Sequence, residues 1–92
     1  MIARRLTIRG RVQGVGYRYA MIDAANALGV RGWVRNRRDG AVEAFVQGDA
    51  DAVERLMSWC RRGPAAARVT EITTVDVTHD STLDAFECWP TE

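Results

Sequence analysis

The sequence contains no lysine among its 92 residues, and only one histidine, two cysteines and two prolines. Two cysteines are too few for a disulfide framework, so Cys60 and Cys88 are expected to be free thiols. No stretch approaches the ~20 apolar residues of a membrane-spanning helix. The histidine, His79, lies in a polar stretch, and no group of His, Cys, Asp or Glu has the spacing of metal ligands. The sequence therefore points away from a disulfide scaffold, a membrane span and a metal centre.

The remaining composition is that of an ordinary globular protein, with 47% hydrophobic and 27% charged residues. A chain of this length forms one domain with a core just large enough to fold alone, so residues 1–92 are expected to be a single domain. The first residues read as a strand and lack the apolar core of a signal peptide. A cytoplasmic protein is expected.

Charge is distributed unevenly along the chain. Residues 1–38 hold nine arginines and one acidic residue, a net charge of +8, whereas residues 39–92 hold four arginines and eleven acidic residues, a net charge of −7. The overall charge of +1 argues against a dedicated nucleic-acid binder. The basic half would attract a small phosphorylated anion. A solvated, arginine-rich sheet edge is the alternative for Arg4, Arg5 and Arg9.

A glycine-rich junction, GRVQGVGYR, links a predicted strand at Arg4–Val12 to a predicted helix at Tyr17–Leu28. Gly14 and Gly16 can adopt positive φ angles, so the turn can point successive backbone N–H groups into one concavity. The helix dipole adds partial positive charge there, and Arg18 can bind two phosphoryl oxygens with its planar guanidinium. The junction is interpreted as a phosphate cradle; a plain tight turn is the alternative.

Two better-known phosphate motifs are absent from this junction. The pattern G-x-x-x-x-G-K-[ST] does not occur, and it requires a lysine that the chain lacks. The dinucleotide-binding pattern fails because Tyr19 occupies the place of its third glycine. Neither a nucleoside triphosphatase nor a dinucleotide-dependent enzyme is predicted.

Hydrophobic periodicity and turn residues define the rest of the chain. In order, the sequence predicts a helix stop at Gly29, a strand at Val30–Asn36, an Asp-Gly hairpin turn at residues 38–40, a strand at Ala41–Gln47, a cap at Gly48-Asp49, a helix at Ala50–Arg62, a bulged or edge strand at Val69–Val77, a polar turn at His79–Asp84, and a short strand at Ala85–Trp89. This order predicts an α+β, ferredoxin-like β-α-β-β-α-β sandwich, in which two helices cover one face of an antiparallel sheet and a short fifth strand is added.

The predicted topology places Asn36 near the cradle. The first strand runs toward the cradle, the helix returns, and the second strand runs toward the same sheet edge and ends near Asn36. Asn36 and Arg18 should therefore be close in space. An asparagine before a turn is also a common turn former, and both interpretations stay open.

The chemistry available at this edge is limited to an arginine, backbone amides and an amide side chain. These groups can hold a phosphoryl group and orient water, but none exchanges a proton readily at neutral pH. Such a site suits an acyl phosphate, because its leaving group is a carboxylate that needs little protonation and phosphoryl transfer depends mainly on positioning and charge stabilisation. A phosphate monoester would require an acid for its alkoxide leaving group, and none is evident.

The segments GRVQGVGYR and GVRGWVRNRRDGAVEAFVQG together resemble the acylphosphatase family. The likeness continues through the second helix, the PAAARV segment and the closing AFECWPT, and so covers nearly the whole chain. The resemblance implies a monomeric, ferredoxin-like hydrolase of carboxyl-phosphate bonds that uses no cofactor or metal. Its partners would be small acyl phosphates, with inorganic phosphate as product and competitive inhibitor, and neither nucleic acid nor membranes.

The resemblance also implies the roles of the site residues. Arg18 would bind the phosphate and Asn36 would orient the attacking water, which makes these two the expected catalytic residues. The cradle would consist of Gln13, Gly14, Val15, Gly16, Tyr17 and Arg18. Tyr17 stands where the family often has phenylalanine, and the Cys-Trp-Pro ending is less typical than an aliphatic one.

Two other functions remain to be weighed. A non-catalytic module that binds phosphate or carboxylate anions would use the same cradle without turnover. An RNA-binding sheet is a weaker alternative, because no strand carries the K/R-G-F/Y-G/A-F-V-x-F/Y pattern. Hydrolysis of benzoyl phosphate would separate the enzyme from the binding module.

Overall fold

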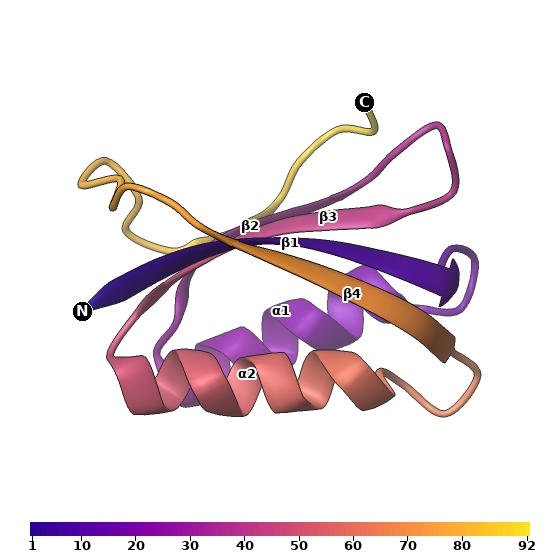
Figure 1. The fold of residues 1–92 in the computed structure, drawn as a ribbon, viewed down its shortest axis with the longest axis horizontal. Helices are drawn as coiled ribbons and strands as arrows, with labels where there is room; N and C mark the ends of the chain where they lie inside the picture. Colours follow the sequence, from indigo (N-terminus) through magenta and orange to yellow (C-terminus); the bar gives the residue numbers. More distant parts are fainter.

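The computed structural model describes residues 1–92 as one five-stranded sheet with two helices on one face (Figure 1). The elements are β1 (Ile2–Arg11), α1 (Tyr17–Leu28), β2 (Arg31–Asn36), β3 (Val42–Gly48), α2 (Ala50–Arg62), β4 (Arg68–Asp76) and β5 (Phe86–Cys88). The predicted order of strands and helices is confirmed. Neither helix is long and apolar enough to cross a membrane.

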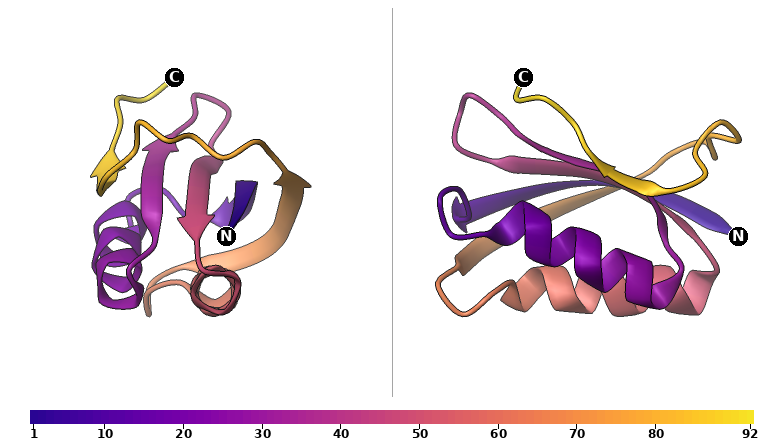
Figure 2. Two further views of the ribbon diagram at one scale, coloured as in Figure 1. Left: turned by 90° about the vertical axis from the view of Figure 1, so that its left-hand side faces the viewer. Right: turned by 180° about the vertical axis from the view of Figure 1, so that it is seen from behind.

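The sheet has the strand order β4-β1-β3-β2-β5. Its first three pairings are antiparallel, as expected for a ferredoxin-like fold, but β5 pairs with β2 in parallel. The antiparallel four-stranded sheet is therefore confirmed, and the short fifth strand, whose direction was not predicted, adds to it in parallel. The reason is the path of the chain after β4, which reverses direction while crossing to the opposite edge, where β2 already runs the same way as β5 (Figure 2).

Strand β4 is both an edge strand and a bulged one, so the broken alternation in its sequence is explained. Arg9 pairs with Glu71 and Gly10 with Val69, which leaves Thr70 as the extra residue of the bulge. Gly10 has φ 125°, and a Cβ there would collide with the carbonyl oxygen of Arg68. Close approach of the two backbones thus requires glycine at this position.

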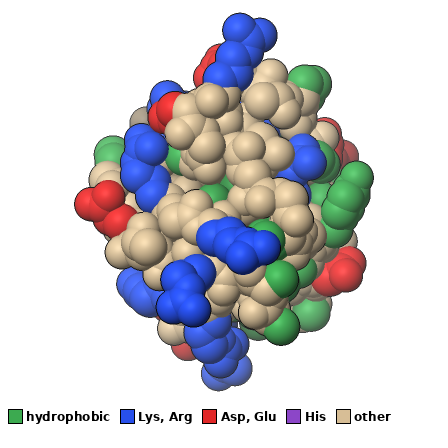
Figure 3. Space-filling view, turned by 90° about the vertical axis from the view of Figure 1, so that its right-hand side faces the viewer, with side chains coloured by type: hydrophobic (Ala, Val, Ile, Leu, Met, Phe, Trp, Pro, Cys, Tyr) green, Lys and Arg blue, Asp and Glu red, His purple; other side chains and the backbone are tan.

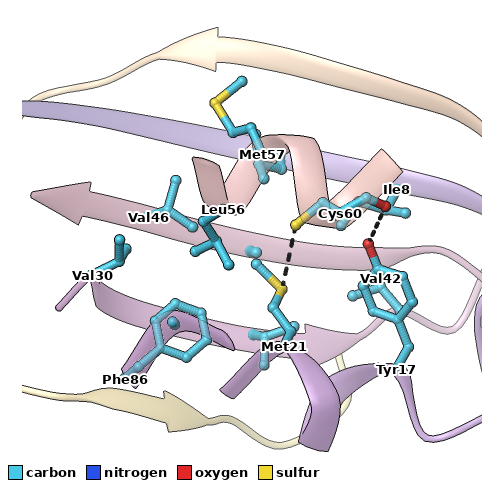
Figure 4. Close-up of a cluster of buried hydrophobic side chains, with 14 of the residues drawn as sticks. Ile8, Tyr17, Met21, Val30, Val42, Val46, Leu56, Met57, Cys60 and Phe86 are labelled. Atoms are coloured by element: carbon cyan, nitrogen blue, oxygen red, sulfur yellow. Dashed lines mark hydrogen bonds between the residues drawn. The ribbon is translucent and has the colours of Figure 1, made fainter. Parts of the chain in front are cut away.

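The main core lies between the sheet and the two helices (Figure 4). The predicted buried stripe of α2 is confirmed in full, because Val53, Leu56, Met57 and Cys60 are all buried. On α1, Met21 and Ala25 are fully buried, and Ala24 and Leu28 pack at the margin. Leu6 and Ile8 on β1 and Val12 just after it are each at most 1% exposed, whereas Gly10 of the same alternating pattern is exposed.

The other face of the sheet is also covered. The chain between β4 and β5 and the residues after β5 lie over it, so every residue of β3 is buried, including Glu43 and Gln47. Trp33 stacks between Phe45 and Trp89, with ring centroids 6.2 and 4.4 Å away. This small second cluster ties the end of the chain to the centre of the sheet.

The helix ends agree with their sequence signals except in one detail. Gly29 adopts the left-handed conformation (φ 72°), and its N–H donates to the carbonyls of Ala25 and Asn26. Asp49 stands at the N-cap of α2, but its side chain makes no capping hydrogen bond. Asp49 thus stands at the predicted cap position but begins α2 only through its backbone, whose carbonyl accepts the N–H of Val53.

A buried polar contact joins the two helices beneath the sheet. The Tyr17 hydroxyl donates to the carbonyl oxygen of Cys60 at 2.7 Å, and the Cys60 thiol lies 4.0 Å from the sulfur of Met21 (Figure 4). Burial raises the pKa of the Cys60 thiol from 9.0 to about 12. Burial also raises the pKa of Tyr17 above its ordinary value of 10.0. Both groups therefore stay protonated in the folded protein at moderately alkaline pH.

Gly32 on β2 should be essential for stability. It has φ 147°, and a Cβ there would collide with the carbonyl oxygen of Phe45, whereas Gly40 (φ 96°) has open space around it. We expect Gly40→Ala to lower the free energy of unfolding by about 1–3 kcal/mol through backbone strain alone. Gly32→Ala should cost more, because the backbones of β2 and β3 must also move apart. Chemical denaturation measures both, and equal losses would contradict this explanation.

Alkaline pH should destabilise the fold through Tyr17 and Cys60. Both folded-state pKa values are raised, so the contribution of Cys60 is complete below pH 9.0 and is lost as pH rises toward about 12, and that of Tyr17 is complete below pH 10.0 and declines above it. Each group should reduce the free energy of unfolding by up to about 1.4 kcal/mol per pH unit in this range. Denaturation curves from pH 8 to 11 measure the decline, which Tyr17→Phe should make shallower above pH 10. A flat profile for the parent would refute the assignment.

Candidate active site

The turn between β1 and α1 is built on two glycines in the left-handed conformation. Gly14 has φ 73° and Gly16 has φ 79°, and apart from the neighbouring residues in the chain no atom lies within 4 Å of the place where either Cβ would stand. Any other residue would be strained there by roughly 1–2 kcal/mol. The glycines thus set the backbone of the turn and leave open space in front of it.

The backbone amides at the start of α1 have no partners within the protein. The first hydrogen bond of the helix runs from the Ala20 N–H to the Gly16 carbonyl at 3.1 Å, so the N–H groups of residues 17–19 lack acceptors. No side chain caps this helix end, and its first turn holds no acidic residue. Free donors and the positive end of the helix dipole together make an anion site.

The residues that carry these amides line a pocket of about 190 Å³. Its lining comes from the end of β1, the turn, the first turn of α1 and the end of β2: Val12, Gly14, Gly16, Tyr17, Arg18, Tyr19 and Asn36. The structure therefore brings the two expected catalytic residues, Arg18 and Asn36, to one cavity. Gln13 and Val15, also assigned to the cradle, do not line it.

The Arg18 guanidinium is not neutralised by any carboxylate. No acidic side chain lies within ion-pair distance of it, and its one side-chain contact is from Nη1 to the Cys88 sulfur at 3.6 Å. A thiol is a weak acceptor. The guanidinium is therefore available to an anion in the pocket.

Asn36 presents an unsatisfied acceptor. Its Oδ1 is buried and has no hydrogen-bond partner in the protein. An unpaired buried polar atom costs about 1–3 kcal/mol, and such groups in native proteins usually serve a ligand or a water molecule. Asn36 ends β2 opposite Val42, so its backbone is held by the sheet.

Gln13 links the two halves of the site with its side chain. Its Nε2 donates to the carbonyl oxygens of Arg37 at 2.8 Å and Ala41 at 2.9 Å. These residues flank the β2–β3 turn, whose Asp39 carboxylate accepts the Ala41 N–H at 3.0 Å. That hydrogen bond, aided by Arg9 and Arg37, holds the pKa of Asp39 below its usual value. Gln13 thus connects the glycine turn to the hairpin of β2 and β3, on which Asn36 lies.

The residues after β5 continue alongside β2 to its end at Asn36. The Trp89 N–H donates to the Val34 carbonyl at 2.9 Å, and the Glu92 N–H donates to the Asn36 carbonyl at 3.1 Å. The Glu92 carboxylate lies 2.9 Å from the Arg35 guanidinium, which packs over the Trp33 ring at 4.8 Å. This support for Asn36 was not predicted from the sequence; the available signal was Trp89, the aromatic residue that follows β5.

Positive charge remains in excess at the end of the molecule that holds the pocket (Figure 3). The expected sheet-edge arginines form ion pairs, with Arg4–Asp76 at 3.0 Å, Arg9–Asp39 at 3.4 Å and Arg5–Glu43 at 3.7 Å. Arg11 and Arg68 face each other across β1 and β4 beside the glycine turn and have no acidic partner. The neutralised arginines are structural, and the unpaired ones favour an anion near the pocket.

Two pocket residues, Val12 and Tyr19, were not assigned to the site from the sequence. Tyr19 lines the cavity and is 69% exposed. From the sequence, Tyr19 was used only as evidence against a dinucleotide-binding motif. Its place one residue after Arg18 on the first helical turn was the signal available.

Comparisons with known proteins agree with this geometry. The family model for acylphosphatase matches residues 4–88. An acylphosphatase of Albidiferax ferrireducens is 59% identical over 71 residues, which cover 77% of this chain and 77% of that protein. Acylphosphatase 2 of Ralstonia nicotianae is 52% identical over 86 residues, covering 94% of this chain and 90% of that protein. The crystal structure of acylphosphatase from Bacillus subtilis has a TM-score of 0.92 at 31% identity and covers 97% of this chain and 99% of its own. The chain belongs to the acylphosphatase family.

Proposed function

We propose that this enzyme hydrolyses the carboxyl-phosphate bond of acyl phosphates by holding the phosphoryl group with backbone amides and Arg18 while Asn36 orients the attacking water. The observation that supports these roles most strongly is that one pocket is lined by residues carrying three groups that lack a strong partner in the protein. They are the amides of the first turn of α1, the Arg18 guanidinium and the buried Oδ1 of Asn36.

The phosphoryl group would lie against the amides at the start of α1. Its oxygens would accept hydrogen bonds from the N–H groups of residues 17–19, which have no acceptors in the protein. Arg18 would add two charge-assisted hydrogen bonds with its planar guanidinium. The phosphoryl oxygens carry charge throughout the reaction, so these groups bind the substrate and also stabilise the transition state.

The attacking water would donate a hydrogen bond to Oδ1 of Asn36. An amide oxygen fixes the position of water without adding negative charge beside an anionic substrate. The water oxygen forms a new bond to phosphorus as the bond from phosphorus to the bridging oxygen breaks. The acyl group leaves as a carboxylate, and both protons of the water end on the released phosphate, as dihydrogen phosphate. No general acid is required, because a carboxylate is a stable leaving group at neutral pH.

This account limits the substrates and the inhibitors. Phosphate monoesters should be hydrolysed poorly, since the pocket holds no histidine or carboxylic acid to protonate an alkoxide leaving group. Inorganic phosphate should compete with the substrate for the amides and Arg18. Loss of benzoyl phosphate in the presence of the purified protein tests the function, whereas phosphate binding without turnover would indicate a binding module.

Arg18→Ala should weaken phosphate binding and lower kcat/KM for benzoyl phosphate by about 10²-fold or more, because Arg18 contacts the phosphoryl group before and during reaction. Arg18→Lys should recover little, since a point charge cannot replace two parallel hydrogen bonds. Arg31→Ala is the matched control: it removes an arginine without an acidic partner at the opposite end of β2 from Asn36 and should change kcat/KM only slightly. Steady-state kinetics and phosphate titration measure these effects, and near-parental turnover in Arg18→Lys would overturn the assignment.

Asn36→Ala should lower kcat by about 10²–10³-fold and leave phosphate binding nearly unchanged, because the water contact matters mainly in the transition state. Asn36→Asp should also be inactive and should bind phosphate more weakly than Asn36→Ala, since it adds a negative charge beside an anion. Asn26→Ala, an exposed position farther along α1, is the control. An active Asn36→Asp enzyme would mean that residue 36 acts as a base or only as a turn former.

A further inference from the structure

Tyr19 is the one large apolar side chain of the pocket that a bound molecule can reach. The other two apolar lining residues, Val12 and Tyr17, are each 1% exposed, whereas Tyr19 is 69% exposed. The rest of the lining is glycine, Arg18 and Asn36. The pocket is therefore polar where the phosphoryl group would bind and aromatic at Tyr19.

The placement of Tyr19 follows from the geometry of α1. Successive helical residues are about 100° apart, so Tyr19 projects about 200° away from Tyr17, which points into the core and bonds to Cys60. Arg18 lies between them. The Tyr19 hydroxyl makes no hydrogen bond within the protein, and the ring packs in neither hydrophobic cluster. The fold thus gives this exposed aromatic ring no structural task.

We propose that Tyr19 contacts the acyl group of the substrate and makes the enzyme favour acyl phosphates with an aromatic or other large apolar acyl group. This inference rests on the proposed function, since it requires the phosphoryl group to bind at the amides and Arg18. A phosphoryl group held there leaves its acyl group to extend toward solvent beside the residue that follows Arg18. A planar apolar acyl group gains contact with the Tyr19 ring, and a methyl group gains little.

The contact has a defined kinetic signature. An aromatic pair of this kind corresponds to roughly a 3- to 10-fold change in affinity. The acyl group remains near the ring in both ground and transition states, so loss of the ring raises KM and leaves kcat nearly unchanged. Arg18 and Asn36 variants, in contrast, affect all acyl phosphates alike.

Tyr19→Ala should raise KM for benzoyl phosphate by about 3- to 10-fold and change KM for acetyl phosphate less than about 2-fold. Tyr19→Phe should behave as the parent with both substrates, and Asn26→Ala serves as the matched control on the same helix. Equal losses with both substrates would overturn the inference, because Tyr19 would then position Arg18 rather than contact the acyl group. No loss with benzoyl phosphate would overturn it as well.

A binding measurement separates this inference from the proposed function. Phenacylphosphonate and acetonylphosphonate carry a methylene in place of the bridging oxygen, so they cannot be hydrolysed. Tyr19→Ala should weaken binding of phenacylphosphonate by about 3- to 10-fold and leave binding of acetonylphosphonate and inorganic phosphate unchanged. That result would support the Tyr19 contact even if the parent failed to hydrolyse acyl phosphates. Equal binding of phenacylphosphonate to parent and variant would refute it.

Discussion

The free backbone amides at the start of α1 are the feature on which the proposed site depends. They exist because Gly14 and Gly16 turn the chain through the left-handed region and no side chain caps the helix. The position of the helix is fixed from beneath, where the Tyr17 hydroxyl bonds to α2 at Cys60. Gly63 after α2 makes room for this ring, since a Cβ there would lie 2.7 Å from it. The anion site thus depends on the position of α1, which its contact with α2 helps to fix.

The second half of the site depends on strand direction. β1 and β2 both pair antiparallel to β3, so they run in the same direction and their ends meet at one edge of the sheet. This arrangement places Asn36 in the lining of the same pocket as the glycine turn. Gln13 from one side and Glu92 from the other then hold the hairpin backbone through direct hydrogen bonds. A neutral amide and a fixed backbone are what a water-orienting role requires.

Local signals in the sequence predicted most of this arrangement. Helix α1 was predicted with its observed bounds because Gly16 and Gly29 mark its two ends. The proximity of Arg18 and Asn36 at one end of the strands followed from the order and direction of the elements alone. The parallel direction of β5, in contrast, depends on the route of the chain between Val77 and Ala85, which no local pattern encodes. The contacts of the Gln13 side chain and the residues after Cys88 were likewise missed, because they are tertiary and join segments far apart in the sequence.

The most direct test of the account is the bond at which water attacks. In the proposed mechanism the Asn36-bound water attacks phosphorus, so a turnover of benzoyl phosphate in ¹⁸O-labelled water should place the label in inorganic phosphate and none in benzoate. Mass spectrometry of the two products from a single turnover gives the answer. Label found in benzoate would show attack at the carbonyl carbon and would contradict the assignment of the amides, Arg18 and Asn36 to the phosphoryl group.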